Sequence, residues 1–315
     1  MGAWARPHRL IGLLTAAVIV LSFISCESEQ VLIVCDPYIE TIHGGAWPLS
    51  ETGFAVRAAL SGFKVDSVTL GAQDDVFVFL ESQEKHLDAI VISPWQSLTA
   101  SDAAAAVGNN DIRIITAGGT ANLPISNSVV SVQPDRSVQM YRLGQLAGDW
   151  ADRTGFPAVL LYNSSKEMNR MEAQLLQNGY AAVDESVPRM QIFDVDGGEQ
   201  GTLPPDFITA ASESSILLLF AGALNPLAME ATDEAAPPVI TEYLYDLTAW
   251  SERIAASVEQ DQIALKKAII AELKNSSPDG TRYYPARVNK GHLYRMIRKN
   301  GLTLLSSQTY NSARR

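Results

Sequence analysis

The sequence is poor in the residues and motifs on which most enzymes depend. It contains only four histidines among 315 residues, and His43, His86 and His292 lie far apart along the chain. It contains no nucleophile elbow G-x-S-x-G, no zinc motif H-E-x-x-H, no Walker lysine loop and no dinucleotide motif G-x-G-x-x-G. These absences argue against the common enzyme classes, and we expect no metal site and no cofactor. A hydrolase built on scattered carboxylate pairs stays open as a weaker alternative.

Cysteine is equally scarce, with Cys26 and Cys35 as the two examples. If Cys26 is modified, Cys35 has no partner and no disulfide can form. A chain of this length buries most of its apolar surface without one. Cys35 ends the apolar run Val31 to Val34, which predicts a small core residue rather than a reactive thiol.

Long apolar stretches are also missing, apart from Leu10 to Ile24 at the start of the chain. This stretch follows Arg6 and Arg9 and is shorter than the roughly 20 residues that span a bilayer. A basic region, a short apolar region and a small residue before a cleavage point are typical of a secretory signal peptide, here residues 1–25.

The residues at the predicted cleavage point resemble a bacterial lipobox. Phe23, Ile24 and Ser25 precede Cys26, although leucine is commoner where Phe23 stands. The resemblance implies that Cys26 carries a lipid (palmitate), that residues 26–30 form a linker, and that the protein lies in the cell envelope facing the periplasm or the exterior. An ordinary cleaved signal peptide with an incidental cysteine is the alternative.

Acidic residues disappear from the chain after Asp279. Removing the signal peptide leaves 22 basic and 35 acidic residues, a net charge of −13. The body from Cys26 to Asp279 carries −21, and the eight basic residues beyond it give the tail +8. The acidic body excludes nucleic acid as a ligand, because phosphate binding needs clustered lysine and arginine. For the tail we expect a helix packed on acidic neighbours, with contact to an anionic membrane surface as the alternative.

Between these ends, short apolar runs alternate with helix-like segments. The runs are near-continuous in hydrophobicity, as in parallel strands that are covered on both faces. This alternation predicts an α/β fold with doubly wound parallel sheets. The expected strands are Val31–Cys35, Ala89–Ser93, Ile112–Thr116, Val129–Val132, Ala158–Tyr162, Ile216–Phe220 and Val239–Thr241. The expected helices are Ser50–Gly62, with Ser50 as a possible N-cap, Val76–Lys85, Ser101–Val107, Ser137–Thr154, Lys166–Asn178 and Gln260–Lys274.

The length fits two sheets, and therefore two lobes joined by crossover strands. A first crossing is expected at Gln133-Pro134-Asp135 and a return at Ile254 to Asp261. The expected domains are lobe 1 at 31–133 plus 258–280, lobe 2 at 134–257, and a basic C-terminal segment at 281–315.

In its order of elements from about Gln30 to Lys274, the chain resembles the type I periplasmic substrate-binding protein superfamily. Within it, the chain is most similar to the basic membrane protein branch of nucleoside-binding lipoproteins. The resemblance rests on the segments Val31–Asp36, Asp88–Ser93 and Ala256–Asp261 leading into Ala268. The chain departs from that branch after Asp36-Pro37-Tyr38, where the glycine-rich loop is missing, and at Glu242, where aspartate is commoner.

The expected binding site lies at the carboxyl ends of the strands, where ligands of open α/β sheets bind. Aromatic faces and hydrogen-bonding groups at these ends suit a sugar or a nucleoside. The candidate ligand-binding residues are Asp36, Tyr38, Trp47, Trp95, Gly118, Asn163, Phe220, Asn225 and Glu242.

Each candidate also has a structural alternative. Asp36 before Pro37 could form a turn, Tyr38 and Trp47 could pack the first loop, and Asn163 and Asn225 could cap helices. Glu242 could pair with the basic tail.

The expected function is that of a lipid-anchored solute-binding protein, not an enzyme, that closes on a small polar ligand and delivers it to an ABC-type permease. The alternative from another class is an interaction or structural lipoprotein that keeps the fold without a ligand. A cleft with Asp36 and Glu242 facing inward favours the binder, and a sealed or apolar cleft favours the alternative.

Overall fold

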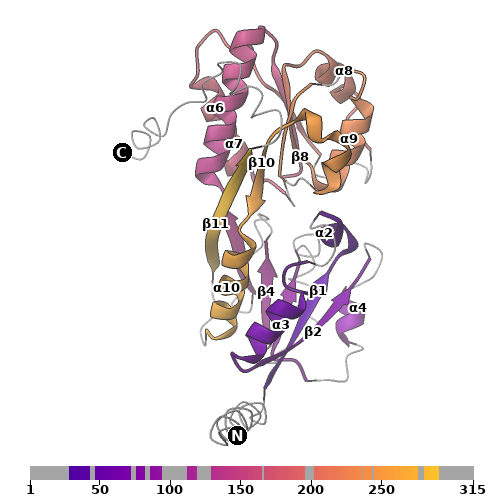
Figure 1. Ribbon diagram of the computed structural model, residues 1–315, viewed down its shortest axis with the longest axis vertical. Helices are drawn as coiled ribbons and strands as arrows, with labels where there is room; N and C mark the ends of the chain where they lie inside the picture. Colours follow the sequence, from indigo (N-terminus) through magenta and orange to yellow (C-terminus); the bar gives the residue numbers. More distant parts are fainter. Residues whose placement is uncertain are drawn as a thin grey trace, which may run out of the picture.

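The computed structural model consists of two α/β lobes, one above the other in Figure 1. It describes residues 28–42, 47–71, 76–81, 86–93, 112–118, 129–164, 167–195, 202–235, 237–242, 245–275 and 280–290. Within these ranges, no helix combines the length and the hydrophobicity needed to cross a membrane.

Lobe 1 is built on five parallel strands in the order β2-β1-β3-β4-β5. The strands are β1 (Glu29–Cys35), β2 (Phe63–Thr69), β3 (Ala89–Ile92), β4 (Arg113–Ala117) and β5 (Val129–Asp135). Its helices are α2 (Pro37–Ile42), α3 (Thr52–Ala59), α4 (Val76–Glu81) and α10 (Gln262–Leu273). Because β1 and β3 are apolar on both faces, each face of the sheet has its own core.

Lobe 2 repeats this arrangement in the order β9-β8-β6-β7, again all parallel. Its strands are β6 (Ala158–Tyr162), β7 (Gln191–Asp194), β8 (Ile216–Phe220) and β9 (Val239–Thr241). Its helices are α6 (Ser137–Thr154), α7 (Arg170–Ala181), α8 (Phe207–Ser212), α9 (Asn225–Ala231) and the 3-10 segments η2 (Gly222–Leu224) and η3 (Tyr245–Arg253). The predicted fold class, two parallel-sheet lobes, is confirmed.

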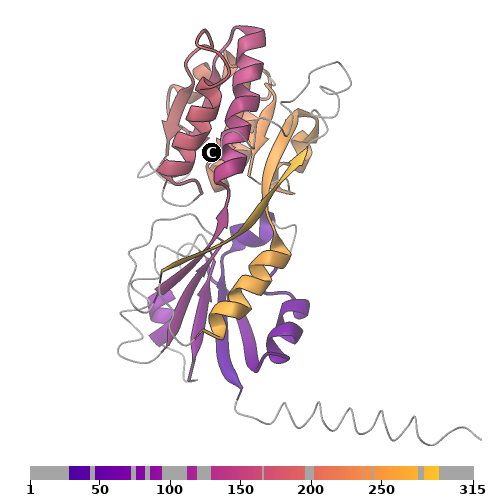
Figure 2. The same ribbon diagram turned by 90° about the vertical axis from the view of Figure 1, so that its left-hand side faces the viewer.

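Three strands run between the lobes. β5 leads from lobe 1 into α6, and β10 (Ile254–Gln260) leads from lobe 2 back to α10. β11 (Thr281–Lys290) pairs in parallel with β5 through its first half and antiparallel with β10 through its second half. It thereby joins the two sheets into one eleven-stranded sheet, and Figure 2 shows it crossing from one lobe to the other.

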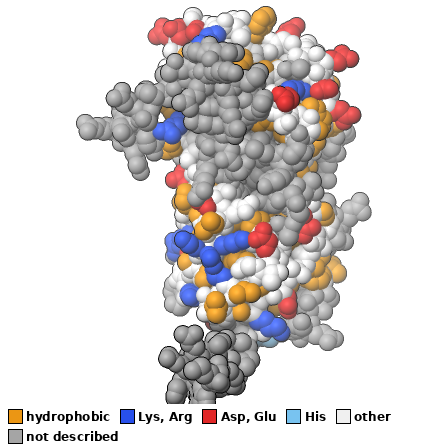
Figure 3. Space-filling model, in the orientation of Figure 1, with side chains coloured by type: hydrophobic (Ala, Val, Ile, Leu, Met, Phe, Trp, Pro, Cys, Tyr) orange, Lys and Arg blue, Asp and Glu red, His pale blue; other side chains and the backbone are white. Residues whose placement is uncertain are grey.

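The expectation of a helix in the basic segment is wrong for residues 281–290, which form β11. Their pattern explains the strand, because Tyr284 and Ala286 are buried while Tyr283 and Pro285 are exposed, the alternation of a half-buried strand. Figure 3 shows lysine and arginine side chains gathered on lobe 1 over α10 and the start of β11. There, Arg282 of β11 pairs with Glu272 of α10. The remainder of the segment, 291–315, lies outside the described residues.

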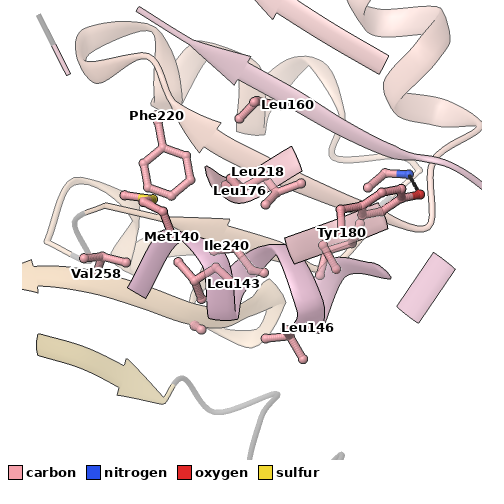
Figure 4. Packing of buried hydrophobic residues seen from close by; sticks show 14 of the residues in the cluster. Met140, Leu143, Leu146, Leu160, Leu176, Tyr180, Leu218, Phe220, Ile240 and Val258 are labelled. Atoms are coloured by element: carbon pink, nitrogen blue, oxygen red, sulfur yellow. Dashed lines mark hydrogen bonds between the residues drawn. The ribbon is translucent and has the colours of Figure 1, made fainter. Parts of the chain in front are cut away.

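The core of lobe 2 lies under α6 and α7 (Figure 4). α6 presents Met140 and Leu143 to the sheet, and Met140 packs near Phe220 of β8. The two helices approach so closely that a Cβ on Gly144 would lie 1.9 Å from the backbone oxygen of Leu176. Glycine is therefore required at this contact, because any larger residue would overlap the backbone of α7.

The strands predicted from apolar runs are all present, with ends that differ by at most three residues. The sequence did not reveal β2 and β7, which lie at the two edges of the sheet and are largely exposed. The expectation that Ser50 caps α3 is wrong: Glu51 is the N-cap residue, without a side-chain bond, and Ser50 donates to the backbone oxygen of Trp47. The helix expected at 101–107 lies outside the described residues.

Candidate functional site

The two lobes face each other through the carboxyl ends of their strands. β5 runs toward lobe 2 in parallel with the other strands of lobe 1, and β10 runs toward lobe 1 in parallel with β9. The carboxyl ends of β1 and β3 therefore face those of β6, β8 and β9 (Figure 1). α2 of lobe 1 contacts η3 of lobe 2, so the lobes touch at this interface.

Asp36 lies on the lobe 1 side of the interface between the lobes, directly after β1. Its Oδ1 accepts from the backbone N–H of Ile39, 2.7 Å away, and its Oδ2 accepts from the hydroxyl of Ser93 at 2.6 Å. Burial raises the pKa of the Asp36 carboxyl, while the bonds from Ser93 and Ile39 oppose that rise. Asp36 thus forms the turn that leads into α2 and also places a carboxyl at the interface between the lobes.

Arg136 occupies the lobe 2 side, between β5 and α6, and its side chain is fully buried. Its Nε and one terminal nitrogen donate to the two carboxylate oxygens of Glu172, at 3.0 and 2.9 Å. It also donates to Glu242 and to the backbone oxygen of Glu167. This planar fork matches two carboxylates at once, so Arg136 fixes the start of α6, the start of α7 and the end of β9 relative to one another.

Local sequence explains how Glu172 reaches this position. Asn169 is the N-cap of α7 and accepts from the backbone N–H of Glu172, and the Glu172 carboxylate accepts in return from Asn169 N–H. This capping box holds Glu172 in the first helical turn. The same carboxylate can then receive Arg136 on the inner side of the helix.

Glu167 and Glu242 form a coupled pair of carboxyl groups beside Arg136. They are 4% and 2% exposed. Burial raises the pKa of the Glu167 carboxyl well above its ordinary value, and the negative charge of the adjacent Glu242 raises this pKa further. The positive charge of Arg136 lowers the same pKa, and the charge of Asp36 raises it. No donor among the described residues reaches Oε1 of Glu167, yet the two carboxyls lie within hydrogen-bonding range. Two carboxyl oxygens attract each other only when one carries a proton, so burial and the adjacent Glu242 favour the form in which Glu167 and Glu242 share a proton.

Gly118, a predicted ligand contact, belongs instead to a hydrogen-bonded chain between the crossover strands. The backbone oxygen of Gly118 accepts from the side-chain amide of Gln260 in β10, and the Gln260 amide oxygen accepts from the hydroxyl of Tyr284 in β11. Burial raises the pKa of the Tyr284 phenol well above its ordinary value, which keeps the hydroxyl protonated as a donor.

Three predicted aromatic contacts lie in cores. Trp47 is fully buried in lobe 1, and Tyr38 is half-buried against the same core. Phe220 is fully buried in the core of lobe 2 (Figure 4). The structure therefore supports packing roles for Trp47 and Phe220, because neither side chain has exposed surface.

The two predicted asparagines stand at strand ends in lobe 2. Asn225 is 1% exposed and its side-chain oxygen accepts from the backbone N–H of Ala221, so it closes the loop after β8 and is not the N-cap of α9. Asn163 is half-buried at the end of β6, and its backbone oxygen accepts from the N–H groups of Glu167 and Met168. The N-cap residues of the two nearest helices are Asn169 for α7 and Leu224 for α9.

Of the remaining candidates, Glu242 lies at the centre of the cluster and is paired with Arg136. Cys26 and Trp95 lie outside the described residues. The sequence interpretation missed Arg136, Glu167 and Glu172. The available signal was an arginine directly after the first expected crossing, followed by a capping motif with a glutamate at its third helical position.

The described residues include no group of three or more histidine, cysteine or carboxylate side chains arranged to hold a metal ion.

Comparison with known proteins settles the fold. No family model and no curated protein sequence matches the chain, but solved structures do. A periplasmic binding protein/LacI transcriptional regulator from Alkaliphilus metalliredigens QYMF, complexed with D-xylulofuranose, is 12% identical, with a TM-score of 0.54 over 84% of this chain and 98% of that one. The chain has the type I periplasmic-binding-protein fold.

Two further structures with this fold carry other ligands. The Caulobacter myo-inositol binding protein, bound to myo-inositol, is 15% identical with a TM-score of 0.53 over 89% of this chain and 98% of that one. An ABC domain from Streptococcus pneumonia in complex with L-Trp is also 15% identical, with a TM-score of 0.54 over 88% and 96%. At these identities the likeness concerns the fold.

Proposed function

We propose that this protein is a solute-binding protein that closes its two lobes on a small polar ligand. The observation that carries the proposal is the buried polar cluster between the lobes. Asp36 contributes from lobe 1, while Arg136, Glu167 and Glu242 contribute from lobe 2. Buried polar groups at an interface between lobes are costly unless they are paired, and a cleft that binds a hydroxylated ligand supplies a reason for their presence.

The ligands of the structural neighbours support a small polar compound. One neighbour binds a sugar, another a cyclic polyol and a third an amino acid. A carboxylate such as Asp36 can accept hydrogen bonds from two hydroxyl groups, as a ribose or a hexose presents them. The proposal therefore names a sugar or a nucleoside. The nucleoside is favoured only by the resemblance to nucleoside-binding lipoproteins.

The location and partner belong to the same proposal. The signal-like start and Cys26 support a lipid-anchored protein on the outer side of a membrane. In that setting the closed form would deliver its ligand to an ABC-type permease.

One alternative is supported by Arg136. Its guanidinium is already bonded to two carboxylates of the protein itself, as expected for an interaction or structural lipoprotein with no ligand. A hydrolase is less well supported. The carboxyls of a glycosidase stand about 5 Å or more apart around the bond that they cleave, whereas Glu167 and Glu242 lie within hydrogen-bonding range of each other.

The test is thermal unfolding of the full-length chain in detergent with a panel of sugars, polyols, nucleosides and amino acids. A ligand at a hundred times its Kd stabilises the folded state by about 2.7 kcal/mol. We expect a shift with one class that is lost in Asp36→Asn and retained in Glu213→Gln, a matched change at an exposed carboxyl. No shift with any class, in protein free of co-purified ligand, would favour the interaction lipoprotein.

A further inference from the structure

We propose that one face of lobe 1 lies on the surface of an anionic membrane. This face, the α3–α10 face, is formed by the outer sides of two helices and of the residues that end them. Its exposed residues are Val56, Arg57, Leu60, Ile263, Lys267 and Lys274. The inference rests on the proposed function for the membrane anchor, to which it adds an orientation of the protein.

α3 and α10 cover the same side of the lobe 1 sheet (Figure 1). α3 buries Phe54, and α10 buries Leu265 and Ile269, in one common core. Nζ of Lys266 in α10 lies 2.5 Å from the carboxylate of Glu51, the N-cap of α3. The exposed residues of each helix are spaced three, four or seven apart, which places them on one side of that helix. Both exposed sides therefore point away from the common core, on the same side of the lobe.

The α3–α10 face carries positive charge that the described part of the protein leaves unpaired. Arg57, Lys267 and Lys274 are exposed, and none of them forms an ion pair with a described residue. The neighbouring carboxylates of Glu51 and Glu272 are each paired with another basic residue. Three cations thus remain available to an external anion.

Apolar side chains stand among these cations. Val56, Leu60 and Ile263 are 56%, 80% and 58% exposed. Figure 3 shows hydrophobic side chains beside the lysine and arginine side chains on lobe 1. Exposed apolar side chains mixed with lysine and arginine are typical of helices that lie at the boundary between lipid headgroups and acyl chains. The face therefore matches an anionic lipid surface in both charge and polarity.

Lobe 2 has the opposite charge. Residues 134–257 include 18 acidic and 7 basic residues, a net charge of −11. Anionic lipids attract basic side chains and repel acidic ones, and this field falls off within about 10 Å of the leaflet at 0.1 M salt. An anionic leaflet would therefore draw the α3–α10 face toward it and keep lobe 2 away from it.

The start of the chain brings the proposed anchor to the carboxyl ends of both helices. The N–H of Glu29 donates to the backbone oxygen of Gly62, directly after α3, at 3.1 Å. The Glu29 carboxylate pairs with Arg113 at 2.6 Å, and Arg113 donates to the backbone oxygen of Asn275, directly after α10, at 3.1 Å. Cys26 precedes Glu29 by three residues, which span at most about 11 Å. A lipid on Cys26 would hold this end of the face near the headgroups, which favours a membrane over a soluble acidic partner.

The experiment measures how fast single lysines are acetylated in the full-length chain incorporated into vesicles of phosphatidylcholine or of phosphatidylglycerol. A short pulse of acetic anhydride, an uncharged reagent, is followed by mass spectrometry. Lys64 is the internal control, because it is exposed on β2 between Phe63 and Val65, which face the core under α3, and so points to the opposite side of the sheet. We expect acetylation of Lys267 and Lys274 to be at least about fivefold slower on phosphatidylglycerol, with less than about twofold change at Lys64.

A matched pair of double variants tests the source of the protection. Arg57→Gln with Leu60→Ser removes one cation and one apolar side chain from the face and should remove most of the protection of Lys267 and Lys274. Arg170→Gln with Met171→Ser makes the same kind of change at two exposed neighbours in lobe 2 and should keep it.

Equal acetylation on the two kinds of vesicle, equal protection of Lys64, or protection that survives in the Arg57 and Leu60 variant would each overturn the inference. Protection of Lys267 and Lys274 on phosphatidylcholine as well would indicate a contact with a second copy of the chain and would also overturn it. In all these cases a ligand-induced thermal shift would leave the solute-binding protein standing. Failure of the chain to float with either kind of vesicle would count against the inference and the proposed anchor together.

Discussion

Replacing Glu167 with glutamine is expected to remove most of the decrease in stability that accompanies a rise in pH above the ordinary pKa of a glutamate. Burial and the adjacent Glu242 raise the pKa of the Glu167 carboxyl well above its ordinary value, so the folded protein keeps this proton to a higher pH than the unfolded chain does. The unfolded chain releases that proton as soon as the pH passes the ordinary value. The contribution of this group to stability is thus complete below the ordinary value and is lost as the pH rises toward the folded pKa.

The size of the effect follows from the difference between the numbers of protons bound by the folded protein and by the unfolded chain. While the folded protein keeps a proton that the unfolded chain has lost, each pH unit lowers the free energy of unfolding by about 1.4 kcal/mol. The native protein therefore loses stability at this rate as the pH rises from the ordinary value toward the folded pKa. Glutamine has nearly the same shape, stays neutral and can donate from its amide to Glu242, so Glu167→Gln should show none of this loss. The raised pKa of Asp36 leaves a smaller slope of the same sign.

Urea denaturation at pH 5.5, 6.5 and 7.5 measures the slope directly. Glu213→Gln changes an exposed carboxyl in the same way and should keep the native slope. If Glu167→Gln kept that slope too, the shared proton would not exist and the description of the cluster would be wrong.

Three further changes test the buried contacts. Arg136→Met should lower the free energy of unfolding by about 3–5 kcal/mol, because it leaves buried carboxylates unpaired. Arg153→Met, which breaks an exposed ion pair, should lower it by less than about 1 kcal/mol. Equal losses in urea denaturation would refute the reasoning. Gly144→Ala forces a Cβ into the backbone of α7 and should lower the free energy of unfolding by about 1–3 kcal/mol. Gly53 has open space around it, so Gly53→Ala should not destabilise the protein. A Gly144→Ala variant as stable as the native protein would contradict the close approach of α6 and α7. Burial raises the pKa of the Cys35 thiol to about 12. A Cys26→Ser variant, in which Cys35 is the remaining cysteine, should therefore react with a thiol reagent only after unfolding. Rapid labelling of the folded variant would contradict this.

The sequence predicted most accurately the strands that are buried on both faces. β6 and β8 are buried on both faces, and their ends were predicted to the residue. β2 and β7 were missed because an edge strand exposes much of its surface and therefore lacks a continuous apolar run. β11 was missed because its pairing depends on two strands from different lobes, which no local pattern records.

The candidate site shows the same division. Asp36 and Glu242 were predicted because each follows a buried strand, a position that topology alone makes informative. Arg136 and Glu167 become important only through their contacts with each other's loops, and such contacts have no signature in a single sequence. Trp47 and Phe220 were assigned to the ligand from residue type, which does not distinguish an aromatic ring in a cleft from one in a core.

The pairing of β11 has a consequence for the order in which the chain can fold. β11 follows every other described strand in the sequence, yet its two halves border β5 of lobe 1 and β10 of lobe 2. A chain that emerges N-terminus first, from a ribosome or from a secretion channel, therefore exposes an unpaired edge on β5 until about 150 residues later. Native pairing across the two lobes is completed only when this strand arrives. A chain of this design cannot complete its folding while β11 is still being made.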